Sequence, residues 1–236
     1  MKFLFFLSGE HPTLPYSEVK ALLNCYQINY KILEQLEQVL IVEIQKPNEK
    51  IQKIANRLAM AHKILNFYCK APTDLASIKE NIIKAGLSRG IENKTFCSRV
   101  RKVKHSYINL TSIDVEKAVA DAIFTSAEKY KQNIKVNLKH PEVEVYSLLT
   151  NGQCLTGITL ANIDRGIFEK RRPHKRPFFS PISLMPRIAR VMVNLGRIKE
   201  NEVLFDPYCG TGGILIEAGL MGIKIIGADV DSEMVA

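Results

Sequence analysis

The sequence predicts an α+β protein that continues into an α/β segment. Three observations support this fold class. Residues 1–70 alternate strand and helix patterns in the order β-α-β-β-α-β, and residues 71–160 combine a long amphipathic helix with a hairpin signal. Residues 181–236 run strand, glycine-rich turn, helix, strand. We therefore expect two small α+β domains, a linker at 161–180 and the first part of a Rossmann-like domain with parallel strands.

The first domain, residues 1–70, is expected to be ferredoxin-like. The apolar run FLFFL at 3–7 predicts a buried strand rather than a signal peptide, because it is too short and Glu10 soon follows. Helical spacing of apolar residues occurs at 16–24 and 48–60. Further strand patterns fall at 28–33, 39–44 and 63–69. This element order is typical of the split βαβ, ferredoxin-like fold.

The second domain, residues 71–160, is expected to be another α+β unit. Two helices are expected at 74–85 and 111–130, and three strands at 134–138, 143–149 and 153–160. Thr111 and Asp114 form a capping pair at the start of the longer helix. Asn151-Gly152 predicts a tight hairpin between the last two strands.

A dense basic run lies between these two helices. Against the single acid Glu92 it carries Arg89, Lys94, Arg99, Arg101, Lys102 and Lys104. Arg99 and Arg101 share one face of an extended strand, with Val103 next on that face. Two guanidinium groups on one face can each fork onto phosphate oxygens. We expect phosphate contacts here; the alternative is an edge strand blunted by solvated cations.

The predicted linker, 161–180, is rich in proline and in cations and keeps neither a helical nor a strand period. We expect an irregular segment that lies across the surface rather than in a core. Its charged cluster is formed by Arg171, Arg172, Lys175 and Arg176. These side chains indicate either a polyanionic partner or a solvated charged run.

The last segment, 181–236, should begin with a helix at 183–196, capped by Ser183 and ended by Gly196. A strand at 202–206 then leads into the sequence DPYCGTGG. A helix and a second strand follow at 212–221 and 224–230. Both strands are expected to be buried on both faces, as central parallel strands are.

The turn DPYCGTGG predicts a nucleotide-type cofactor site. Gly210, Gly212 and Gly213 let the backbone approach a ligand, and the following helix offers free N–H groups. Asp229, at the end of the second strand, can accept both hydroxyls of an adenosine ribose. The order strand, turn, helix, strand and acid is much more specific than a lone G-x-G. A glycine-rich packing turn with a capping aspartate is the alternative.

Asp206 distinguishes between the two cofactors that use this architecture. Its carboxylate would repel the pyrophosphate of a dinucleotide, yet it suits the cationic methionyl part of S-adenosyl-L-methionine. We therefore expect S-adenosyl-L-methionine, and an NAD-type enzyme is the weaker interpretation.

Composition limits the partners and the compartment. Lys and Arg outnumber Asp and Glu by 33 to 24, which gives a net charge of +9 and favours a nucleic acid as partner. The five cysteines form no C-x-x-C pair, so neither a zinc site nor a disulfide framework is expected, and a reducing cytoplasm fits best. No apolar run approaches the length of a membrane span, so no membrane partner is expected.

Several segments resemble archaeal and eukaryotic tRNA guanine-N2-methyltransferases that carry a THUMP domain. They are PHKRPFFSP, RIARVMVNL, VLFDPYCGTGGILIEAGLMG and GADVD. The stretch VNLKHPEVEVY at 136–146 and the hairpin after it are similar to the end of a THUMP domain. The resemblance covers nearly the whole chain, although the first sixty residues match only in pattern.

The resemblance implies a domain plan and a set of contacts. It implies that residues 71–160 form a THUMP domain, which in the family binds the acceptor end of tRNA. It also implies that residues 181–236 belong to a domain that methylates N2 of a guanosine, typically at tRNA position 10. The implied S-adenosyl-L-methionine contacts lie in or beside the turn, at Asp206, Tyr208, Gly210, Thr211, Gly212, Gly213 and Asp229. The implied tRNA contacts are Arg99, Arg101, Lys102, Lys104 and the linker cations Arg171, Arg172, Lys175 and Arg176.

One motif of that family has no counterpart in this sequence. The family acts through D/N-P-P-Y/F at the end of the fourth strand, whereas this chain contains no Pro-Pro dipeptide and ends at Ala236. No catalytic residue can therefore be carried over. We expect a C-terminally truncated family member, inactive alone, with an open apolar sheet edge that invites a second chain carrying the missing part. A non-catalytic RNA-binding module built from residues 1–160 is the alternative function.

Overall fold

The structure is a computed structural model that describes residues 1–45, 50–103, 110–176, 180 and 183–231. Lys104, one of the predicted RNA contacts, lies outside the described residues. The chain divides into two compact units. The sheet unit comprises Met1–Phe6, Lys31–Glu43 and Lys63–Ala161. The turn unit comprises Leu7–Tyr30, Ile44–His62 and Asn162–Ala236.

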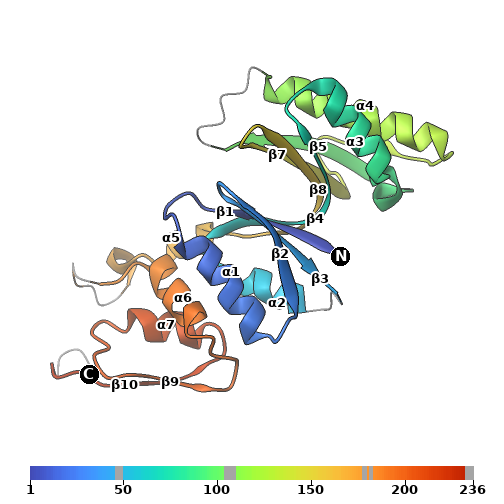
Figure 1. The fold of residues 1–236 in the computed structure, drawn as a ribbon. Coiled ribbons are helices and arrows are strands. Elements are labelled where there is room, and N and C mark those ends of the chain that lie inside the picture. Colours follow the sequence, from blue (N-terminus) through green and yellow to red (C-terminus); the bar gives the residue numbers. More distant parts are fainter. Residues whose placement is uncertain (46–49, 104–109, 177–179, 181–182, 232–236) are drawn as a thin grey trace. The chain divides into compact units, whose positions relative to one another are not determined.

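An eight-stranded sheet organises the sheet unit (Figure 1). Its first four strands are β1 (Lys2–Leu7), β2 (Tyr30–Leu36), β3 (Val39–Ile44) and β4 (Ala61–Pro72). Their spatial order is β2-β3-β1-β4, and β1 pairs antiparallel with β3. The chain order β-α-β-β-α-β combined with this strand order confirms the predicted ferredoxin-like pattern.

The second half of the sheet continues in the order β8-β7-β5-β6. It consists of β5 (Thr95–Lys102), β6 (Lys135–Val136), β7 (Val143–Thr150) and β8 (Gln153–Asn162). Helices α3 (Leu75–Ala85) and α4 (Ser112–Lys129) lie side by side over β5 and β7 (Figure 1), and a 3-10 turn, η1 (Leu87–Ile91), follows α3. Buried apolar side chains from the helices and the strands, among them Ile82, Val119 and Phe96, form one core between them.

Local signals in the sequence explain where these elements begin and turn. Thr111 accepts a hydrogen bond from the backbone N–H of Asp114 at 3.1 Å, which is the predicted cap of α4. Asn151 and Gly152 take φ angles of 47° and 71° between β7 and β8, as a tight hairpin requires. The expected strand at 134–138 is shorter than predicted, because only Lys135–Val136 pair with β5.

The turn unit contains the helices α1 (Leu14–Cys25), α2 (Lys50–Arg57), α5 (Gly166–Lys170), α6 (Pro186–Leu195) and α7 (Gly213–Gly219), the 3-10 turn η2 (Pro173–Lys175), and the strands β9 (Val203–Asp206) and β10 (Lys224–Gly227). A buried polar joint links α1 to α6. The carboxylate of Glu18 accepts hydrogen bonds from the backbone N–H of Ala59 and Met60, each at 2.9 Å, and from Asn194 at 2.8 Å. Burial raises the pKa of Glu18, although these donors oppose the shift.

The linker differs from the irregular surface segment that we predicted. It forms α5 and η2, and Phe168 is 2% exposed. The ring of Phe168 packs in an apolar cluster with Ala59, Met60 and Val191. A single large apolar side chain thus anchors this charged segment. One such residue creates no periodic apolar pattern, so the sequence did not predict the anchor.

The parallel strands β9 and β10 also differ in burial from the prediction. Gly227 aligns with Asp206 in their parallel register, and α7 connects them as a βαβ unit. Phe205 and Ile226 are 59% and 54% exposed, so the expectation of strands buried on both faces is wrong for the described residues. Within the described chain each strand pairs only with the other, while Leu204 packs with Ala218 and Ile223 in one small core.

Candidate functional site

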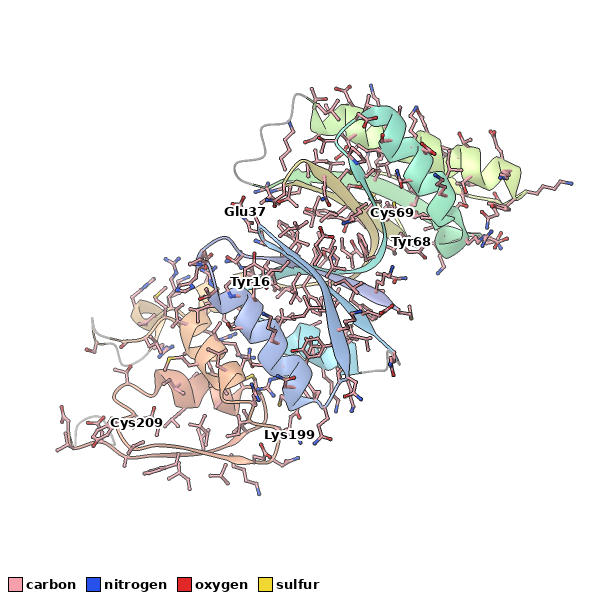
Figure 2. The ribbon with its side chains drawn as sticks, viewed as in Figure 1. Tyr16, Glu37, Tyr68, Cys69, Lys199 and Cys209 are labelled. Carbon is pink, nitrogen blue, oxygen red and sulfur yellow. The ribbon has the colours of Figure 1, made fainter. Side chains whose placement is uncertain are left out.

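The glycine-rich turn joins β9 to α7, and Cys209, labelled in Figure 2, lies within it. Gly210 and Gly212 have φ angles of 49° and 70°, in the left-handed region that side chains rarely adopt. A Cβ at either position would meet nothing within 4 Å. Backbone conformation, rather than crowding, therefore requires glycine at these two positions and leaves open space beside the chain.

Two strand ends hold this turn in place. Cys209 donates its N–H to the carbonyl of Ala228, which in turn donates to the carbonyl of Asp206, both at 2.9 Å. The carboxylate of Asp229 accepts from the N–H of Gly210 at 2.7 Å and of Asp231 at 3.0 Å. These backbone donors lower the pKa of Asp229 below its ordinary range. The acid that we predicted as a ribose contact thus also fixes the glycine turn.

A cavity of about 240 Å³ opens at the turn. Its lining residues are Ser183, Leu184, Asp206, Tyr208, Cys209, Gly210, Thr211, Gly213 and Ile214. Five of the seven predicted cofactor contacts are therefore brought together around one space; Gly212 and Asp229 lie in or against the turn without lining it. One oxygen of Asp206 accepts from the N–H of Tyr208 at 3.1 Å, and Tyr208 is 81% exposed.

The residues present fit one end of S-adenosyl-L-methionine. The cavity is somewhat smaller than typical pockets for whole cofactors, which are ~300 Å³ or more. It offers an anionic group, a hydroxyl and exposed backbone to a ligand of mixed polarity. If S-adenosyl-L-methionine is bound, it supplies an electrophilic methyl group on a sulfonium; the residues of the turn can orient it and balance its charge.

Sequence reasoning missed Ser183 and Leu184 as members of this cavity. Ser183 was expected to cap the helix, but α6 begins at Pro186 with Met185 at its N-cap and no capping side chain. The hydroxyl of Ser183 instead accepts a hydrogen bond from Thr211 Oγ1 at 2.9 Å. Nothing in the spacing of this serine distinguishes a helix cap from a residue folded back onto a distant turn.

Behind the turn, α7 is fixed by a buried ion-pair triad. Glu217 is fully buried, and its two carboxylate oxygens accept hydrogen bonds from Nε and Nη2 of Arg171 at 2.9 and 3.1 Å. Oε2 of Glu217 also lies 2.9 Å from Nε and 2.7 Å from Nη2 of Arg190, as a hydrogen bond and an ion pair. Burial lowers the pKa of Arg190, while Glu217 counteracts this shift. Arg171, a predicted RNA contact, therefore has a bidentate partner inside the protein.

The other linker cations fall into two groups. Arg172 pairs with Glu169 at 2.5 Å and Lys175 donates to the carbonyl of Glu169 at 3.0 Å, both in exposed or half-exposed settings. Arg176 donates through Nε to the carbonyl of Arg171 at 3.2 Å, but its two terminal nitrogens are buried and have no hydrogen-bond partner among the described residues.

The basic strand presents its cations differently. Following the alternation along β5, Arg99 and Arg101 share one face, as predicted. This face lies opposite α3 and α4, and Lys102 lies on the other face. Val103 continues the face of the arginines but is buried in a second apolar cluster. Arg101 and Lys102 are exposed, whereas Arg99 is half-buried and donates to the carbonyl of Leu138 at 3.0 Å.

Two negative observations apply to the described residues. His, Cys, Asp and Glu nowhere gather there in a group of three or more that could hold a metal ion. Over the same residues, every helix is too short or too polar to cross a membrane.

Comparisons with known proteins agree with this geometry. A family model for the RMKL-like methyltransferase domain matches residues 173–235, and the THUMP domain model matches residues 72–158. The tRNA (guanine(10)-N2)-dimethyltransferase of Methanocaldococcus jannaschii is 35% identical over 98% of this chain and 67% of its own length. The enzyme of the same name from Methanothermobacter thermautotrophicus is 36% identical over 100% and 66%.

The fold has a counterpart among solved structures. The crystal structure of TrmN from Thermus thermophilus aligns over 100% of this chain and 67% of its own, with a TM-score of 0.59 at 19% identity. The chain thus spans about two thirds of the length of the relatives that it matches. It belongs to the family of THUMP-domain tRNA guanine-N2-methyltransferases.

Proposed function

We propose that this chain serves the transfer of a methyl group from S-adenosyl-L-methionine to N2 of a guanosine in tRNA, at position 10. The observation that carries the proposal is the glycine turn held between Asp206 and Asp229, in a chain 35% identical to a tRNA (guanine(10)-N2)-dimethyltransferase. Because the carboxylate of Asp206 lines the cavity and would repel a pyrophosphate, the turn suits a nucleoside cofactor that lacks one.

In this proposal different residues of the turn contact different parts of the cofactor. Asp229 keeps lone pairs for the ribose hydroxyls after accepting the N–H of Gly210. Asp206, which lines the cavity, balances the positive charge of the methionyl part. Gly210 and Gly212 let the backbone lie against the ligand. We assign no residue of the described chain to the chemical step at N2.

We propose RNA contacts in each of the two units separately, made by exposed or half-exposed cations. In the sheet unit these are Arg99, Arg101 and Lys102 on β5, where the two arginines share one face. In the turn unit we include Arg172, whose side chain is 42% exposed, and Lys175, which is exposed. Phosphate contacts of this kind supply affinity without sequence selectivity, so the target guanosine must be chosen by other means.

The test combines cofactor binding with methyl transfer. Calorimetry should detect binding of S-adenosyl-L-methionine but not of NAD. Labelled cofactor and unmodified tRNA should then give N2-methylguanosine at position 10 in mapped digests when a second chain carrying the D/N-P-P-Y/F motif is added, because this sequence contains no Pro-Pro dipeptide. Binding of tRNA without cofactor binding would favour the alternative, an RNA-binding module, since the sheet unit carries the basic strand on its own.

A further inference from the structure

A second cavity of the turn unit opens between α5, α6 and the segment that precedes α1. It measures about 160 Å³ and shares no lining residue with the cavity at the glycine-rich turn. Its apolar lining is Phe168, Met185, Pro186 and Ile188, and its polar lining is Glu10, Glu169 and Arg187. A cavity of about 150 Å³ accommodates one six-membered ring. The space therefore suits a single planar ring with a polar edge.

The polar groups of this second cavity are only partly engaged. Arg165 and Arg187 both donate to Oε1 of Glu10, the latter at 2.5 Å, and Oε2 of Glu10 accepts no hydrogen bond within the described residues. Nη2 of Arg187 lies 3.6 Å from Oε1 of Glu169, which is too long for a hydrogen bond. The cavity thus offers a guanidinium N–H and two carboxylate oxygens that still have bonding capacity.

The charge of the lining disfavours a phosphate as the ligand. Two carboxylates and one guanidinium line the cavity, so a phosphate would approach more negative than positive groups. A neutral ring whose edge carries both a donor and acceptors would meet complementary partners instead. The side chains of Glu10 and Glu169 are 45% and 44% exposed, so a ligand can reach them from the surface.

From these observations we infer that the second cavity binds an unpaired cytosine base of the RNA substrate. The N4 amino group of cytosine donates to Glu169 or Glu10, and N3 and O2 accept from Arg187. The apolar lining residues contact the faces of the ring. Uracil carries an acceptor in place of the amino group and would set it against a carboxylate. The inference rests on the proposed function, because that function supplies the RNA.

Two labelled RNA oligomers of equal length test this inference, because they carry the same phosphates and differ only in the base. Fluorescence anisotropy with the whole chain should show that oligocytidylate binds about tenfold more tightly than oligouridylate, the discrimination of one matched base contact. Glu169→Gln should reduce this ratio to about one, because an amide can offer either base a suitable partner. Glu128→Gln, which changes an exposed carboxylate on α4, is the matched control and should preserve the ratio.

A second variant tests the donor. Arg187→Lys keeps the positive charge but loses the planar fork, so it should weaken oligocytidylate and leave oligouridylate unchanged. Far-UV circular dichroism of each variant verifies that the fold is retained.

The outcomes that contradict the inference are distinct from those that contradict the proposed function. If the chain binds tRNA but shows equal affinity for the two oligomers, the cytosine site is overturned and the proposed function stands. A preference for oligocytidylate that Glu169→Gln and Arg187→Lys both leave intact would also overturn the site. If the chain binds neither tRNA nor either oligomer, the proposed function fails, and the site fails with it.

Discussion

Two arginine-rich segments, the strand β5 and the linker that carries α5 and η2, have similar charge but different settings. On β5, Arg101 points away from the helices and is exposed. In the linker, Arg171 is bound in two places to Glu217, a carboxylate with no exposed surface. The first kind of cation is available to a phosphate, and the second neutralises a charge inside the protein.

The difference shows what decides the role of a cation. The side chains on one face of a strand stay exposed unless another element covers that face. The linker is held down by Phe168, which brings Arg171 beside the buried carboxylate of α7. A buried carboxylate requires such a partner, because an unpaired charge in the interior is strongly unfavourable. A basic run therefore indicates RNA binding only where no buried acid competes for it.

The largest effect should come from removing the buried acid. Glu217→Gln leaves Arg190 and Arg171 without their charge partner, so the free energy of unfolding should fall by about 3–5 kcal/mol. Urea unfolding followed by circular dichroism measures this change. Glu169→Gln is the control, since Glu169 is 44% exposed in its side chain and such a pair contributes only about 0–1 kcal/mol. Equal stability of the two variants would contradict a structural role for the linker arginines.

The next effect concerns the strand. Arg99→Ala combined with Arg101→Ala should weaken tRNA binding about tenfold per arginine, because each charge-assisted contact contributes ~1.5 kcal/mol. The slope of log affinity against log salt should decrease by about 1.4–1.8 for two lost phosphate contacts. Filter binding at several salt concentrations measures both quantities. Lys224→Ala, an exposed cation on β10, is the control, and an unaltered slope in the double variant would refute the RNA surface on β5.

A conservative exchange should affect the two segments in opposite ways. Arg171→Lys loses the fork of two bonds to Glu217 and should lower the free energy of unfolding by about 1.5 kcal/mol without altering tRNA affinity. Arg101→Lys should change stability by less than about 0.5 kcal/mol, as surface exchanges usually do. Should Arg171→Lys instead weaken tRNA binding and spare stability, the linker and the strand would be equivalent after all.

The smallest effect is a titration at the turn. Hydrogen bonds from Asp231, Gly210 and Val230 lower the pKa of Asp229, so its carboxylate stabilises the folded turn at neutral pH. A depressed pKa means that this stabilisation is present above the unfolded value and is lost as pH falls through the folded value. The amide resonance of Gly210 should therefore shift with a midpoint below the ordinary 3.8, measured by NMR. A midpoint above 3.8 would show that the carboxylate does not hold the turn.

Most of the fold could be read from local patterns. The cap at Thr111, the hairpin at Asn151-Gly152 and the glycine turn after Asp206 each depend on the conformations that those residues themselves favour. Element order then fixed the ferredoxin-like strand arrangement. The linker was predicted less well, because α5 is short and is stabilised by one buried ring rather than by a periodic apolar face.

Part of the candidate site escaped prediction for the same reason. The glycines and the two aspartates follow each other along one βαβ unit, so their proximity is determined by short connections. Ser183 reaches Thr211 from 28 residues away, and Arg171 reaches Glu217 from 46 residues away. Pairings at such separations depend on how α5 and α6 pack, and a single sequence carries no local signal for that packing.

The sequence by itself determined the family and an excess of positive charge that favours an anionic partner. It also determined the turn after Asp206, where two positions with positive φ require glycine. Only the tertiary structure decided which of the cations and hydroxyls are free to act. In the folded chain Arg171 pairs with Glu217. Ser183, which we expected to cap a helix, lies at the cavity and binds Thr211, and Arg101 is exposed. The physical reason is that backbone conformation is set by neighbouring residues, whereas the burial and pairing of a charge depend on segments far apart in the chain.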